Sequence, residues 1–188
     1  MIALLLAALD DPSLEADFMI IFDKYEKRIL KYAYCCLNDF DSAQIVTQDT
    51  FFAFARRMHD IDYSIDTAVS AYLYKVAKNK CYKMAEMGKK KPQIIFLGDE
   101  DQFIEDFDNK NAIEETAISN ETIQKMQAFL NELPEIYRDV LSLHYISGLS
   151  ARDIAETIEI PVNTAKTHLR RAKIRIKEFW KKEEDNAK

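Results

Sequence analysis

Glycine and proline are scarce in this chain of 188 residues, which contains three glycines and four prolines. Disordered segments and turn-rich β proteins use one or both of these residues heavily, so their scarcity argues against both classes. Hydrophobic residues make up 48% of the chain and charged residues 31%. This composition can bury a core and predicts a helical protein.

The chain also lacks a long apolar run. The longest, Ile2 to Leu9, has eight residues, whereas a helix needs about 20 to span a bilayer. No Lys or Arg precedes the run, as a secretory signal peptide would require. We therefore expect a cytoplasmic protein without membrane insertion.

Residues and motifs typical of metal sites and catalysis are few. The three cysteines include the adjacent pair Cys35 and Cys36, are odd in number and lack CxxC spacing, so we expect reduced thiols. His59, His144 and His168 are too scattered to indicate a metal site. A glycine-rich phosphate loop and the common hydrolase motifs are also missing. The sequence predicts neither an enzyme nor a cofactor.

Acidic and basic side chains are unevenly distributed. Residues 92–125 carry nine acidic and two basic side chains, whereas residues 162–182 carry eight basic and one acidic. The acidic stretch predicts a flexible linker between domains at 1–91 and 126–188. It is either a solvated tether or a segment that mimics nucleic acid and lies in a basic channel. The basic stretch favours contact with DNA.

Apolar residues recur at helical spacing three times in the N-terminal half. The stripes are Phe18, Phe22, Tyr25, Ile29, Tyr32 and Cys36; then Ala43, Val46, Thr50 and Phe54; then Val69, Leu73, Val76 and Ala77. Three amphipathic helices of this kind can bury their stripes together. Gly88 and Pro92 predict the end of the third helix.

The C-terminal part has the pattern of a helix-turn-helix. Pro134 suits a helix start and Gly148 a helix end, while Ser150 and Asp153 have the spacing of a capping box. A short turn at 159–161 then leads to a long basic helix. The predicted fold is therefore all-α, with two small helical domains and a helix-turn-helix in the second.

The apolar spacing of the last helix predicts which of its faces is exposed. Ala165, Leu169, Ala172, Ile176 and Phe179 should face the core. At about 100° per residue, the other side then presents donors suited to duplex DNA. We expect this contact from Asn163, Thr164, Lys166, Thr167, Arg170 and Arg171.

A second polar stripe lies on the third predicted helix, where Lys75, Lys78, Asn79 and Tyr82 fall at i, i+3, i+4 and i+7. Cations can follow a phosphate backbone, and an aromatic ring and an amide can bind unpaired bases. A solvated lysine face has the same pattern, so the spacing alone leaves both interpretations open.

Residues 133–173 closely resemble the C-terminal DNA-binding domain of extracytoplasmic-function (ECF) sigma factors of the sigma-70 family. The resemblance lies in LPEIYR, in GLSARDIA and in PVNTAKTHLRRAK. Asn163, Ala165 and His168 replace the usual Gly, Val and Arg, which leaves the promoter sequence open. AQIVTQDTFFAF at 43–54 and YLYKVAKN at 72–79 resemble the N-terminal domain of the same family.

This resemblance implies a dissociable promoter-specificity subunit of bacterial RNA polymerase. The helix-turn-helix would bind the minus-35 element as duplex, and the stripe on the third helix, extended by Tyr72, would bind unpaired minus-10 bases. The implied contacts with polymerase core, at its clamp, are Gln44, Gln48, Asp49 and Phe51. The linker would pass through the polymerase, a flap contact would hold the C-terminal domain, and an anti-sigma factor is an expected partner.

Two other classes remain alternatives. TAKTHL also resembles the helix-turn-helix of LuxR-type regulators, although the N-terminal half lacks the alternating strands of a receiver domain. The other alternative is a sigma-like interaction protein that binds polymerase or an anti-sigma factor without promoting transcription. Gln44 and Ile45 favour it, because they replace an acidic pair typical of the family.

Overall fold

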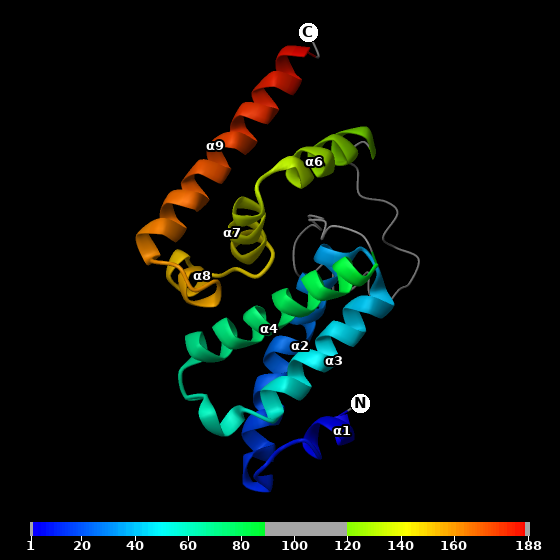
Figure 1. The fold of residues 1–188 in the computed structure, drawn as a ribbon, viewed down its shortest axis with the longest axis vertical. Helices are drawn as coiled ribbons and strands as arrows, with labels where there is room; N and C mark the ends of the chain where they lie inside the picture. Colours follow the sequence, from blue (N-terminus) through cyan, green and yellow to red (C-terminus); the bar gives the residue numbers. More distant parts are fainter. Residues whose placement is uncertain (1, 89–119, 187–188) are drawn as a thin grey trace. The chain divides into compact units, whose positions relative to one another are not determined.

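The computed structural model describes residues 2–88 and 120–186. They form two compact units, one with helices α1 to α4 and the other with helices α6 to α9 (Figure 1). Every regular element in these two ranges is a helix, so the predicted all-α fold is confirmed. Within the same ranges, no helix is both long and apolar enough to cross a bilayer.

The N-terminal unit is a bundle of three long helices with shorter helical segments around it. Its elements are α1 (Ile2–Leu6), the 3-10 turn η1 (Pro12–Leu14), α2 (Glu15–Leu37), α3 (Phe40–Ala55), the 3-10 turn η2 (Met58–Asp60) and α4 (Asp66–Met87). α2, α3 and α4 pack against one another, as the three apolar stripes predict. Gly88 caps the end of α4, as expected.

Aromatic side chains fill the core of this bundle. Phe18, Phe51 and Phe54 are fully buried. The ring centroids of Phe22 and Phe51 are 4.8 Å apart, and those of Tyr32 and Tyr74 are 5.5 Å apart, in edge-on contact. Truncating a buried aromatic ring to Ala typically costs about 3–5 kcal/mol. These contacts therefore fix how α3 and α4 are rotated, and so which residues they expose.

The C-terminal unit contains α6 (Asn120–Glu132), α7 (Glu135–Tyr145), α8 (Ala151–Thr157) and α9 (Val162–Asn186). α9 packs on both α7 and α8. The rings of Phe129 and Phe179 stack with centroids 4.5 Å apart, which joins α6 to α9. α6 starts at Asn120, so helix extends into the range 92–125 that was predicted to be a linker; residues 92–119 lie outside the described residues.

Cys35, Cys36 and Cys81 are buried, and none of them forms a disulfide; that their thiols are reduced stays a prediction. They belong to the N-terminal bundle and contribute apolar volume to its core.

Candidate nucleic-acid interface

The turn between α8 and α9 is built by local hydrogen bonds. The hydroxyl of Ser150 accepts from the backbone N–H of Asp153, whose carboxylate accepts from the N–H of Ser150, so the predicted capping box is present. Glu159 has a left-handed backbone with φ of 56°, and the next N–H, of Ile160, donates to the carbonyl of Ala155 over 2.9 Å. These bonds end α8 and direct the chain into α9.

Buried alanines determine the rotation of α9. Ala165 and Ala172 are 1% and 0% exposed, and Leu169 between them is also buried. Asn163, Lys166, Arg170 and Arg171 are exposed, whereas Thr164 and Thr167 are partly buried. The hydroxyl of Thr167 donates to the carbonyl of Asn163 over 2.8 Å, which leaves its oxygen as an acceptor. The structure therefore places all six predicted residues on the outer side of the first turns of α9.

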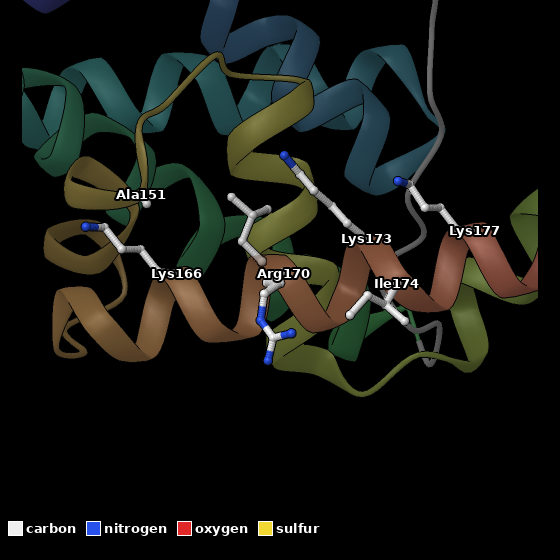
Figure 2. Close-up of a pocket in the computed structure, with 7 residues that line it drawn as sticks. Ala151, Lys166, Arg170, Lys173, Ile174 and Lys177 are labelled. Atoms are coloured by element: carbon white, nitrogen blue, oxygen red, sulfur yellow. The ribbon is translucent and has the colours of Figure 1, made fainter.

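This outer side of α9 has a strong positive charge. Lys166, Arg170 and Arg171 form no ion pair within residues 120–186. Figure 2 shows Lys166, Arg170, Lys173 and Lys177 following one another along α9, with Ala151 of α8 near Lys166. Unpaired cations on an exposed helix are suited to phosphate groups.

The polar stripe on α4 is also present. Asn79 is exposed, and Lys75, Lys78 and Tyr82 are partly buried. The ammonium of Lys78 lies 5.3 Å from the centroid of the Tyr82 ring. A cation and an aromatic ring are thus held together on the surface, a combination common in proteins that bind unpaired nucleic acid.

Tyr72 is bound more closely to the bundle than the rest of the stripe. Its hydroxyl donates to the carbonyl of Ala53 in α3 over 3.3 Å, and its ring contacts that of Phe54. Burial is the main cause that raises the pKa of Tyr72 above its usual value. Its contact with unpaired bases stays a prediction.

The third predicted site, on α3, needs one correction. Gln44 is exposed and Gln48 and Asp49 are partly exposed, but Phe51 is fully buried against Phe22. The expectation that Phe51 contacts polymerase is wrong, because its ring points into the bundle and has no accessible surface.

Sequence reasoning missed two apolar side chains on the same face of α3. Ile45 is 52% exposed and Phe52 is 37% exposed. Together with Gln48 and Asp49 they fall at i, i+3, i+4 and i+7, so the helical spacing could have identified them. The face therefore combines apolar and polar side chains.

Comparison with known proteins gives the family. The family model "Sigma-70 region 2" matches residues 21–89, and "Sigma-70, region 4" matches residues 123–176. The first match includes α3 and α4 and the second includes the helix-turn-helix. A sigma-70 region in the N-terminal half leaves the LuxR-type alternative without support.

A curated relative supports these matches, and two solved structures share the fold. The ECF RNA polymerase sigma factor SigW of Bacillus subtilis is 31% identical over 164 residues, which cover 83% of this chain and 84% of SigW. The fold resembles that of CnrH in complex with the cytosolic domain of CnrY, with a TM-score of 0.60, 15% identity and 96% of each chain covered. It also resembles the sigma factor RpoE in complex with the anti-sigma factor NepR from Bartonella quintana, with a TM-score of 0.58, 19% identity and 91% and 98% of the two chains covered. The chain therefore belongs to the ECF family of RNA polymerase sigma factors.

Proposed function

We propose that this sigma factor directs RNA polymerase core to specific promoters through three separate surfaces, on α9, α4 and α3. It acts by binding and catalyses no reaction of its own. The observation that carries the proposal is the rotation of α9, in which buried Ala165 and Ala172 leave Arg170, Arg171 and Lys166 exposed and without an ion pair to any residue that the structure describes.

The outer side of α9 binds the minus-35 element as duplex DNA. Lys166, Arg170 and Arg171 contact phosphates, and Asn163, Thr164 and Thr167 influence the choice of base. Asn163 is exposed near the start of α9, the part of a recognition helix that meets base edges in helix-turn-helix complexes.

The stripe on α4 binds unpaired bases of the minus-10 element. Lys75 and Lys78 hold the backbone, Asn79 binds a base edge, and Tyr82 provides a stacking surface. Tyr72, about one turn before Lys75, extends the stripe. The proximity of Lys78 to the Tyr82 ring supports this division of roles.

The exposed face of α3 contacts polymerase core at its clamp, through Gln44, Gln48 and Asp49. Exposed Ile45 and Phe52 add apolar area to this contact, which compensates for the acidic pair that the family usually carries there. The C-terminal unit contacts the flap of polymerase, and the acidic segment 92–119 crosses its interior.

An anti-sigma factor is a further proposed partner. One similar structure carries the anti-sigma factor NepR and another the cytosolic domain of CnrY, which supports a search for a protein of this class. A partner of polymerase core works where transcription takes place, so we propose a cytoplasmic location.

Transcription from purified components tests the proposal. Core polymerase with the wild-type chain should give defined transcripts from a library of genomic fragments, and core alone should not. The variant Arg170→Ala with Arg171→Ala should lose these transcripts, while Arg175→Gln with Lys182→Gln, which removes two cations elsewhere on α9, should keep them. Core binding without transcripts from any fragment would instead support the interaction protein.

A further inference from the structure

A hollow of about 400 Å³ opens beside the outer side of α9. Four cations line it, Lys166, Arg170, Lys173 and Lys177, together with the apolar side chains of Leu169 and Ile174 (Figure 2). Lys173 and Lys177 belong to none of the three proposed surfaces. The hollow therefore extends the positive surface of α9 toward its C-terminal half.

The spacing of these cations produces a straight positive edge. Residues 166, 170, 173 and 177 fall at i, i+4, i+7 and i+11, so they share one side of the helix. At about 1.5 Å per residue this edge is about 16 Å long. One strand of B-DNA carries a phosphate every 3.4 Å or so along the helix axis, so the edge can meet more than one phosphate.

His144 of α7 holds the side chain of Lys173 in place. The Nδ1 atom of His144 donates to the carbonyl of Leu149 over 3.0 Å, which leaves Nε2 as an acceptor 3.3 Å from the ammonium of Lys173. An ammonium has three donors, so Lys173 keeps donors for a second acceptor. A side chain already held in position loses less conformational entropy when it binds a ligand.

We infer that this hollow binds the sugar-phosphate backbone of one DNA strand, with Lys173 and Lys177 as phosphate ligands beyond the six residues proposed for the minus-35 contact. The inference rests on the proposed function of α9. DNA suits the hollow because it shares Lys166 and Arg170 with the proposed duplex interface. The apolar side chains of Leu169 and Ile174 in the lining suit the apolar edge of a deoxyribose, and the four cations suit its phosphates.

Salt dependence of DNA binding by the full-length chain tests this inference. Two duplexes serve as probes, one selected by wild-type holoenzyme from a randomised pool and one taken from the unselected pool. The double variant Lys173→Gln with Lys177→Gln is compared with a control, the double variant Arg175→Gln with Lys182→Gln. The control removes the same charge, but its two positions lie about 140–160° around α9 from Lys173 and Lys177. Arg175 lies over the ring of Tyr137, so thermal melting of each variant is measured alongside.

Two phosphate contacts contribute about 1.8 to the slope of log affinity against log salt. The slope for Lys173→Gln with Lys177→Gln should therefore be smaller by about 1.8 on both duplexes, and the control variant should keep the wild-type slope. Three results would overturn the inference. They are an unchanged slope for Lys173→Gln with Lys177→Gln, a loss of slope confined to the selected duplex, and an equal loss of slope in the control variant. If Arg170→Ala with Arg171→Ala still weakens binding in that case, the proposed function of α9 stands and only the hollow is excluded.

Discussion

The ammonium of Lys80 lies 2.7 Å from the carboxylate of Asp49, which joins α4 to α3. Asp49 belongs to the proposed contact with polymerase core, and Lys80 lies between residues of the proposed minus-10 stripe in the sequence. Both side chains are partly exposed, at 48% and 39%. Exposed ion pairs typically contribute about 0–1 kcal/mol, so the pair is weak enough for a partner to compete for Asp49.

Exchanging the two charges separates the structural role of this pair from its role in binding. Asp49→Lys alone should lower the free energy of unfolding by up to about 1 kcal/mol, because it places two cations together. It should also weaken binding to core, because the proposed contact loses a carboxylate. Asp49→Lys combined with Lys80→Asp should restore stability but not core binding. Urea unfolding and affinity for immobilised core measure the two effects; recovery of both in the double variant would show that Asp49 acts only through the fold.

A buried phenol and a carboxylate join α2 to α4. The hydroxyl of Tyr25 donates to the carboxylate of Asp66 over 2.7 Å, and Lys24 also pairs with Asp66. Burial first, and then Asp66, raise the pKa of Tyr25 above its ordinary value of 10.0. The hydrogen bond from Lys24 is the main cause that lowers the pKa of Asp66 below its ordinary 3.8.

The signs of these shifts predict how stability depends on pH. Because the pKa of Tyr25 is raised, Tyr25 contributes to the free energy of unfolding at pH values below 10.0, the ordinary pKa of a phenol. This contribution is lost as the pH rises above that value. Because the pKa of Asp66 is lowered, Asp66 contributes to the free energy of unfolding at pH values above 3.8. This contribution is lost as the pH falls below that value. Tyr25→Phe should therefore flatten the alkaline loss of hydrogen-exchange protection in α2 and α4. Tyr63→Phe is the matched control, and an equal effect there would assign the alkaline loss to other groups.

The helices and the outer side of α9 follow from sequence because both depend on local spacing. Ala165, Leu169 and Ala172 are buried in the expected order, and Ser150 and Asp153 form the expected capping box. Phe51 is buried because it lies on the apolar side of α3, next to Thr50, so its helical position indicates the core even though the family motif implies a contact.

Contacts between helices could not be predicted in the same way. Lys80 and Asp49 are 31 residues apart, and His144 and Lys173 are 29 residues apart. Each pair depends on how two helices are rotated and packed, which a single sequence does not specify through spacing. The hollow beside α9 was missed for the same reason, since α8 and α9 form it together.

Two residues with positive φ give opposite predictions around the helix-turn-helix. Glu159 has φ of 56° and Gly148 has φ of 69°. A left-handed backbone costs a residue with a side chain about 1–2 kcal/mol, while glycine loses about 0.5–1 kcal/mol more entropy on folding. Glu159→Gly should therefore stabilise the C-terminal unit by about 0.5–1 kcal/mol, and Gly148→Ala should destabilise it by about 1 kcal/mol.

Fluorescence of Trp180, the one tryptophan of the chain, reports urea unfolding of this unit. A Cβ at Gly148 would meet nothing within 4 Å, so a loss there reflects the backbone alone. Destabilisation by Glu159→Gly would show that the contacts of the Glu159 side chain outweigh its backbone strain.

Strand opening provides a test of the stripe on α4. A base that leaves the duplex needs a stacking surface and hydrogen-bond donors, and stacking on an aromatic ring contributes about 1–3 kcal/mol per base. Tyr82 and exposed Asn79 are the proposed sources. Asn79→Ala combined with Tyr82→Ala should abolish permanganate reactivity of minus-10 thymines, because the opened strand loses both. Affinity for core and the minus-35 footprint should stay near wild type, since α3 and α9 are unchanged.

A promoter template with mismatched bases across the minus-10 element is the matched control for this double variant. Mismatched bases are already unpaired, so the cost of opening is removed and only capture of the single strand remains. Transcription from this template should recover in part, whereas transcription from the paired template should stay low. If the paired template opens normally with the double variant, the α4 stripe is a solvated face and the N-terminal unit acts only in docking on core. If neither template is transcribed and core binding also falls, the substitutions have disturbed the packing of α4. The variant Asn79→Asp with Tyr82→Phe retains more of each side chain. In that case it decides whether the stripe itself binds bases.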